Sequence, residues 1–176
     1  MRDFTNNELM FDYRLSKLIR YNHRHRVKDE SVAEHSYYVV LFCMKICKHY
    51  RFDAETTNNI LTKAILHDLP EIAISDVPYD VKQNIPQLRY LLEDAEKEFY
   101  KKHYFEYYDK VYNGNTLEDL IVRYADTLSV LQYCLNELAI SPMNTDFLEI
   151  RANTIMRLEA IKKEIRQELK NVRGEK

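Results

Sequence analysis

The sequence predicts an all-α protein that forms a single domain over residues 1–176. Only two of the 176 residues are glycines, which disfavours the many tight turns of a β-rich fold. Between the few helix-breaking residues, apolar side chains recur at the spacing of helices. A chain of this length can also bury a hydrophobic core without disulfides. We therefore expect a bundle of about six or seven helices.

The first two helices are expected on either side of a basic segment. One is predicted over residues 5–20, from its pattern of leucine and isoleucine residues. Ser31 can cap the next helix, which runs to about residue 50. In that helix His35 recurs with Val32 and Val39 at helical spacing, so we expect its side chain to face the core.

A third helix is expected to end at a pair of polar residues. Asp53 opens this helix, whose apolar residues lead directly to His67 and Asp68. Pro70 then disfavours its continuation. Neighbours inside a helix point about 100° apart, but a loosened last turn can let both side chains approach one ion.

The second half of the chain is expected to form three longer helices. A proline-marked loop over residues 70–86 precedes a helix from about residue 87 to residue 112, which stops at Asn113-Gly114-Asn115. Thr116 begins the next helix, with acidic residues in its first turn. A final helix is predicted from about residue 145 to residue 170, with a mixed-charge outer face.

Composition excludes several classes of protein. The formal net charge is −2, whereas surfaces that bind duplex DNA or RNA are usually basic. The best apolar run, residues 39–47, is too short to span a bilayer, and the N-terminus lacks the apolar stretch of a signal peptide. The three cysteines show no metal-binding or redox spacing and fit a reducing compartment. We expect a cytoplasmic protein that binds neither duplex nucleic acid nor membranes.

Four residues in the predicted helices are of types that ligate divalent metals: His35, His67, Asp68 and Asp126. Taken singly each has an ordinary explanation, because a lone inward histidine is usually a hydrogen-bonded core residue and a lone aspartate is usually solvated. Together they offer imidazole nitrogen and carboxylate oxygen from three apolar helices. The combination indicates a metal-dependent hydrolase.

Four stretches of the chain resemble the HD-domain phosphohydrolases and, more closely, the YfbR-like 5′-deoxynucleotidases. They are Ser31-Val-Ala-Glu-His35-Ser, Ile65-Leu-His67-Asp68-Leu-Pro-Glu71, Ser75-Asp76-Val-Pro78 and Arg123-Tyr-Ala-Asp126-Thr-Leu. The resemblance runs from about residue 13 to about residue 160, and it is specific because the order and the context of the motifs match together. It implies an HD-domain helical bundle around one metal site.

The resemblance also implies roles for individual residues. His35, His67, Asp68 and Asp126 would ligate one divalent ion, for which cobalt, manganese, zinc, iron and nickel all suit the ligand types. Glu71 would act as general acid or base. Asp76 would position a water or protonate the departing 5′-oxygen, although capping the turn before Pro78 is an equally physical role.

Three further residues correspond to substrate contacts of the family. Arg20 would orient the nucleotide. Tyr21 stands where the best-known relatives have a tryptophan that excludes a ribose 2′-hydroxyl, and its own hydroxyl leaves the preference for deoxyribose open. Lys82 is a candidate phosphate contact, with an exposed lysine as the alternative.

The leading functional hypothesis is hydrolysis of a deoxynucleoside 5′-monophosphate to deoxynucleoside and phosphate. A second is release of triphosphate from a deoxynucleoside triphosphate, for which Arg24, Arg26, Lys28 and Lys82 could meet the extra charge, although a solvated basic loop also explains the first three. A third is a non-catalytic helical interaction module. The tyrosine-rich segment from residue 99 to residue 112 offers more aromatic surface than one helix face can bury, which predicts a homodimer.

Overall fold

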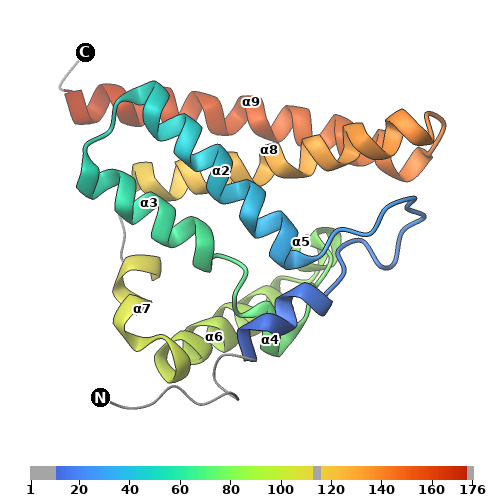
Figure 1. Cartoon of the computed structure of the whole chain (residues 1–176), viewed down its shortest axis with the longest axis horizontal. Coiled ribbons are helices and arrows are strands. Elements are labelled where there is room, and N and C mark those ends of the chain that lie inside the picture. Colours follow the sequence, from blue (N-terminus) through green and yellow to red (C-terminus); the bar gives the residue numbers. More distant parts are fainter. Residues whose placement is uncertain (1–10, 113–115, 174–176) are drawn as a thin grey trace.

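The computed structural model describes residues 11–112 and 116–173, and within these ranges the named elements are all helical (Figure 1). In chain order they are the 3₁₀ helix η1 (Tyr13–Lys17) and the α-helices α2 (Val32–Tyr50), α3 (Ala54–Leu66), α4 (Glu71–Ile74), α5 (Tyr79–Asn84), α6 (Pro86–His103), α7 (Phe105–Tyr112), α8 (Thr116–Ile140) and α9 (Thr145–Arg173). Six of them have eight residues or more, which confirms the predicted all-α bundle. In the same ranges, none of the helices combines the length and hydropathy needed to cross a membrane.

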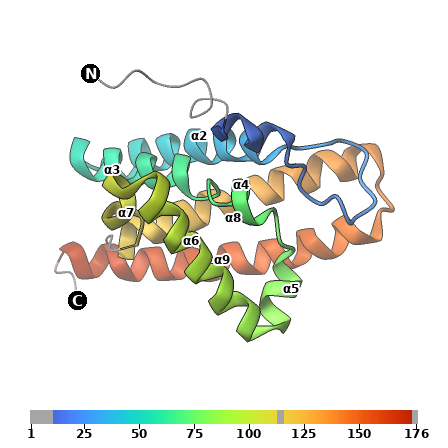
Figure 2. The same cartoon turned by 90° about the horizontal axis from the view of Figure 1, so that it is seen from below.

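The main core is formed by the two longest helices and by the pair α2 and α3. Helices α8 and α9 run antiparallel along the long axis, and α2 and α3 pack against α8 (Figures 1 and 2). Buried residues of all four helices meet there, including Val39, Ile60, Ile121 and Ile161. Cys43 and its neighbour one turn on, Cys47, are buried free thiols of this core.

Two predicted helix starts are confirmed by their caps. The Ser31 hydroxyl accepts a hydrogen bond from the backbone N–H of Glu34, and the Glu34 carboxylate accepts one from the backbone N–H of Ser31, which completes a capping box. Asp53 caps α3 by accepting from the backbone N–H of Thr56. These caps set where α2 and α3 begin, and hence where His35 and the end of α3 lie.

The first predicted helix, over residues 5–20, ends earlier than expected, and its residues 5–10 lie outside the described residues. Residues 11–17 are helical, with η1 over Tyr13–Lys17, and Leu18 has an extended backbone. Its carbonyl accepts from the N–H of Val32, and the N–H of Arg20 donates to the carbonyl of Glu30, so residues 18–20 pair with the segment before α2. These long-range backbone bonds replace the intrahelical ones that the apolar pattern suggested.

The long helix predicted over residues 87–112 is broken. Tyr104 leaves the helical region, with φ −141° and ψ 45°, and separates α6 from α7. The break turns two helix faces inward, so that Phe99 and Tyr100 are buried and Tyr112 packs against them in a second cluster. The aromatic surface expected here is therefore only partly internal, because Phe105 and Tyr107 remain exposed. The predicted stop at residues 113–115 lies outside the described residues.

The segment predicted as a loop, residues 70–86, contains the short helices α4 and α5. The carbonyl of Pro70 accepts from the backbone N–H groups of Ala73 and Ile74, so the proline begins a helical turn after it has ended α3. Ser75 then takes a positive φ of 64° with an extended ψ of 166°, and the chain turns towards α5. Glu71 and Asp76 belong to this segment and therefore lie at the edge of the site described below.

Candidate metal centre and adjoining pocket

His35 lies in the first turn of α2 and is fully buried. Its Nδ1 is 3.2 Å from the hydroxyl of Ser129 on α8. Its Nε2 lies 3.1 Å from Oδ1 of Asp126, also on α8, and 3.5 Å from Oδ2 of Asp68. Since Asp126 and Ser129 are three residues apart, they lie on one face of α8, and this face contacts both ring nitrogens of His35.

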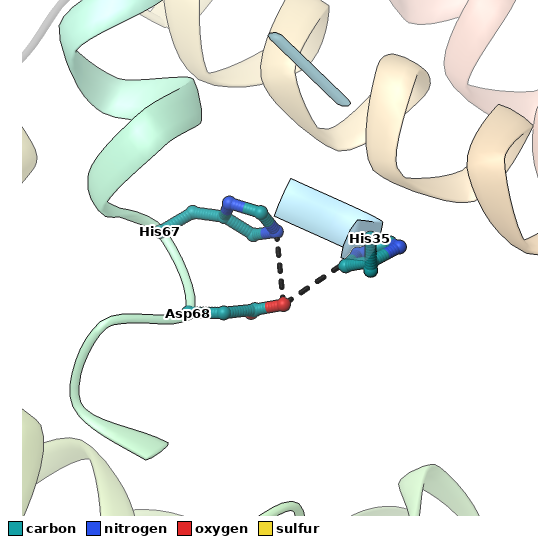
Figure 3. A group of neighbouring side chains, drawn as sticks. All are labelled: His35, His67 and Asp68. Atoms are coloured by element: carbon teal, nitrogen blue, oxygen red, sulfur yellow. Dashed lines mark ion pairs between the residues drawn. The ribbon is translucent and has the colours of Figure 1, made fainter. Parts of the chain in front are cut away.

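His67 and Asp68 lie where α3 ends, as predicted. His67 is the C-cap residue, and its Nδ1 is 2.7 Å from the carbonyl oxygen of Ala64. A carbonyl only accepts hydrogen bonds, so Nδ1 carries a proton and donates it, which leaves Nε2 as the nitrogen available to a ligand. That Nε2 lies 3.1 Å from Oδ2 of Asp68, and Figure 3 shows both side chains directed towards His35.

Three of the four predicted ligands share one small space. One ligand atom each from His35, His67 and Asp68 lies within 4.8 Å of the other two, whereas Asp126 reaches the group through His35. The Nε2 atoms of both histidines are buried and make no hydrogen bond, although each has a carboxylate oxygen 3.1 Å away. Two unsatisfied imidazole nitrogens beside carboxylate oxygens fit a divalent cation. The cluster can therefore bind a metal.

The protonation states suit this use. Burial and the positive charge of Arg20 lower the pKa of His35, so its ring is neutral. Burial alone would raise the pKa of Asp68, but the charge of His67 holds it below its usual range. Burial would lower the pKa of His67, yet the carboxylate of Asp68 outweighs it and raises that pKa to about 9. A metal at this site must therefore displace one proton, from His67.

Glu71 lies one turn beyond Asp68, at the start of α4. Its backbone N–H donates to the carbonyl of Asp68, and its Oε2 is buried without a hydrogen-bond partner. Burial, together with the negative charges of Asp68 and Asp76, raises the pKa of Glu71 to about 9. At neutral pH this carboxyl group therefore holds its proton and can donate it, and the charge of a cation at the neighbouring ligands would lower its pKa and allow it to accept one.

A pocket of about 520 Å³ opens beside the cluster. Among the predicted site residues, it is lined by Arg20, Tyr21, Asp68, Glu71, Asp76, Lys82 and Asp126. The two histidines are not part of its lining and lie behind the carboxylates. These seven residues come from five stretches of the sequence, and the structure brings them together around one cavity.

Arg20 and Tyr21 enter the pocket from the segment before α2. The guanidinium of Arg20 donates to the carboxylate of Glu30 at 2.9 Å and lies 5.3 Å from the centre of the Tyr21 ring. Tyr21 has a left-handed backbone, with φ 55°, which is costly for a bulky residue. Its ring stacks on Tyr133 at 5.3 Å and meets the edge of Phe147 at 5.7 Å. Packing against α8 and α9 therefore supports the strained conformation.

Glu137 holds the same segment and was not predicted to do so. It is fully buried on α8, and its two carboxylate oxygens accept from the backbone N–H groups of Val27 and Lys28 at 2.7 and 2.8 Å. The hydroxyl of Tyr133, one turn earlier, donates to the carbonyl of Lys28. The sequence does contain a signal for this role. Glu137 lies on the apolar side of a predicted helix, between Cys134 and Leu138, and a buried carboxylate there needs a partner.

Comparison with known proteins gives concordant results. A family model described as 5′-deoxynucleotidase YfbR-like matches residues 9–171. A 5′-deoxynucleotidase of Yersinia pestis (strain Pestoides F) is 27% identical over 152 residues, which cover 79% of this chain and 76% of that protein.

Solved structures share the fold. A protein of Pyrococcus horikoshii OT3 superposes with a TM-score of 0.74 at 22% identity, covering 96% of this chain and 95% of its own. The HD phosphohydrolase DatZ of cyanophage S-2L, solved with dA and one catalytic Zn²⁺ ion, superposes with a TM-score of 0.64 at 18% identity, covering 93% of this chain and 99% of its own. The predicted HD-domain bundle is confirmed.

Proposed function

The chain belongs to the YfbR-like 5′-deoxynucleotidase family, and on this premise we propose that it hydrolyses deoxynucleoside 5′-monophosphates to deoxynucleoside and phosphate. The observation that carries the proposal is the histidine and aspartate cluster at the wall of a pocket that also presents Arg20 and Lys82. Cations beside a metal centre suit a substrate whose reacting group is a phosphate.

His35, His67, Asp68 and Asp126 would hold one divalent ion, and cobalt, manganese, zinc, iron or nickel suits this mixed set. When bound, such an ion lowers the pKa of water and neutralises charge on phosphoryl oxygens. Ser129 and the carbonyl of Ala64 orient the two imidazole rings through their Nδ1 atoms. The ligands are thus held in place before any ion or substrate arrives.

Glu71 is the proposed general acid and base. Its Oε2 can accept a proton from the attacking water and return it to the 5′-oxygen as the ester bond to phosphorus breaks. The raised pKa of Glu71 keeps that proton available for the leaving group. Asp76 also lines the pocket, where it can orient the water or the departing oxygen.

Arg20 and Lys82 are the proposed phosphate contacts, and Tyr21 the proposed sugar contact. The ion pair with Glu30 keeps the Arg20 guanidinium in place, with its side chain only 13% exposed. The Tyr21 ring is held by Tyr133, so a deoxyribose would meet a fixed aromatic edge.

The triphosphate alternative has less support from the positions of the cations. Arg24 lines the pocket together with Lys82, but Arg26 donates to Asp29 and to the carbonyl of Tyr21, and Lys28 is not part of the lining. Two of the four cations expected to bind a triphosphate, Arg26 and Lys28, therefore do not line the pocket. A non-catalytic module does not explain why each ligand residue and Glu71 is retained.

Residence in the cytoplasm and assembly into a homodimer remain predictions. Since Phe99 and Tyr100 are buried, a dimer contact in this region would use more exposed side chains such as Phe105, which is 73% exposed. Sedimentation at micromolar concentration should show twice the chain mass, and a monomer alone would contradict the dimer.

The test is product analysis with a panel of deoxyribonucleoside and ribonucleoside mono- and triphosphates, with cobalt or manganese added. We expect orthophosphate from the deoxymonophosphates, and release at least about 100-fold slower from Asp68→Ala or Glu71→Ala protein. Inorganic triphosphate from a deoxynucleoside triphosphate would favour the alternative. Absence of any metal-dependent product would contradict both.

A further inference from the structure

One wall of the pocket has no role in the proposed chemistry. It is formed by α9, through Glu149, Ile150, Asn153, Thr154, Met156 and Arg157. Residues 149, 153 and 156, and likewise residues 150, 154 and 157, are spaced by four and three, so together they form a single face of the helix. A helix face that lines the substrate pocket but carries neither a metal ligand nor Glu71 is available to contact the rest of the substrate.

The base of this wall is apolar and fixed. Val130 and Ile150 line the pocket and also pack, with Tyr21, against the buried cluster of Tyr133 and Phe147. Val130 follows Asp126 on α8 by one turn, a rise of about 6 Å. Apolar surface therefore begins about one helical turn from the metal centre, next to the proposed sugar contact.

Two exposed side chains continue the wall. Met156 is an apolar side chain with 65% of its surface exposed, and its flexible thioether adapts to flat partners. Asn153 is exposed as well, and its amide makes no hydrogen bond within the described part of the chain. That amide offers a donor and an acceptor side by side, which is the pattern on the edges of nucleobases.

We propose that this face of α9 is the nucleobase subsite, in which Ile150 and Met156 pack against the flat base and Asn153 hydrogen-bonds to its edge. The inference rests on the proposed function, since it takes the phosphate to lie beside Arg20 and the metal centre. The pocket volume of about 520 Å³ lies within the range of sites for small organic ligands and leaves room beyond the phosphate.

The experiment compares two substrates that differ only in the base. 2-Deoxyribose 5-phosphate has the sugar and phosphate ester of dAMP but lacks the adenine. The test variant is Asn153→Ala combined with Met156→Ala. The matched control combines Asn171→Ala with Met143→Ala, which removes an exposed asparagine and an exposed methionine of α9 and its preceding turn, outside the pocket lining.

We expect the wild-type protein to favour dAMP over the sugar phosphate. The test variant should lose about tenfold in kcat/KM for dAMP, the loss of roughly one hydrogen bond and some packing, and less than about twofold for the sugar phosphate. The control should behave as wild type on both. Retained turnover of the sugar phosphate shows that the test variant is folded and keeps its metal centre.

Two results would overturn the subsite. One is an equal loss on both substrates, which would mean that α9 acts on the sugar, the phosphate or the fold. The other is no loss on either, which would mean that the base lies elsewhere. If the wild-type protein hydrolyses neither substrate with metal present, the proposed function fails and the subsite fails with it, and this outcome is distinct from the other two.

Discussion

The two ends of the pocket are built in different ways. At the metal end, side chains from α2, α3 and α8 converge in the interior, and the Nδ1 atoms of His35 and His67 each have a partner. At the α9 end, the side chains of Asn153 and Met156 are exposed and lie on one helix. One end depends on the packing of the whole bundle, whereas the other depends on a single surface.

This difference predicts which changes the protein tolerates. A substitution at the metal end leaves a buried polar or charged group without its partner. This lowers the free energy of unfolding by up to several kcal/mol, and it affects the turnover of every substrate alike. A substitution on α9 changes only the side chains that contact the nucleobase. Chemistry should therefore be sensitive to the interior, and base preference to the α9 face.

The largest effect is expected for Asp68→Asn at the metal end. The amide keeps the shape of the side chain but removes the negative charge that pairs with His67, so the site should lose its metal and at least about 10³-fold in kcat/KM. Metal content and dAMP turnover measure both. Asp94→Asn, an exposed aspartate outside the pocket, is the control. A fully active Asp68→Asn protein with bound metal would contradict the claim that the metal end depends on this carboxylate.

The next effect is expected for Glu71→Gln. Glutamine cannot exchange a proton, so kcat should fall about 10²- to 10³-fold, in the range found for general acid and base groups. Metal content should stay unchanged, because Glu71 is not among the clustered ligands. A loss of metal would make Glu71 a ligand instead, and an unchanged kcat would remove it from the chemistry.

Proton competition at His67 should make metal affinity depend on pH. In the metal-free protein the pKa of His67 is raised to about 9, so below that pH its proton must leave when an ion binds. Affinity should rise about tenfold per pH unit, and thus about 100-fold from pH 6 to pH 8. Titration calorimetry in two buffers of different ionisation enthalpy should detect about one proton released. An affinity independent of pH would contradict the Asp68 and His67 pairing.

The smallest effect on catalysis is expected for Glu137→Ala, which touches neither end directly. The backbone N–H groups of Val27 and Lys28 would lose charged acceptors, at a cost of about 2–4 kcal/mol in the free energy of unfolding. The segment that carries Arg20 would shift, so KM should rise about tenfold with metal content unchanged. Glu137→Gln, which keeps one acceptor oxygen, should lie between the variant and wild type. An unchanged KM would make Glu137 purely structural.

Much of the metal end could be predicted from sequence because its signals are local. Ser31 and Asp53 cap their helices with side chains a few residues away from their targets, and Pro70 ends α3 after the His67 and Asp68 pair. Each of these features depends on chemistry within one turn of the chain. The local pattern therefore sufficed to place the ligand residues on their helices.

The parts that failed depend on contacts between distant segments. Residues 18–20 are not helical because they bond to the segment near Glu30, and the break at Tyr104 allows packing against α3 and η1. The role of Glu137 depends on a segment more than a hundred residues earlier in the chain. The α9 wall carries no motif at all, since its residues gain significance only from the pocket they line. The helical periodicity of the sequence does not reveal such contacts between distant segments.

The most direct test of the metal centre is a titration of metal-free protein with cobalt or manganese, in which hydrolysis of dAMP is measured against bound metal. With His35, His67, Asp68 and Asp126 holding a single ion, orthophosphate release should rise linearly and reach its plateau at one equivalent per chain. Turnover that persists without metal, or that requires two equivalents, would contradict a single-ion site.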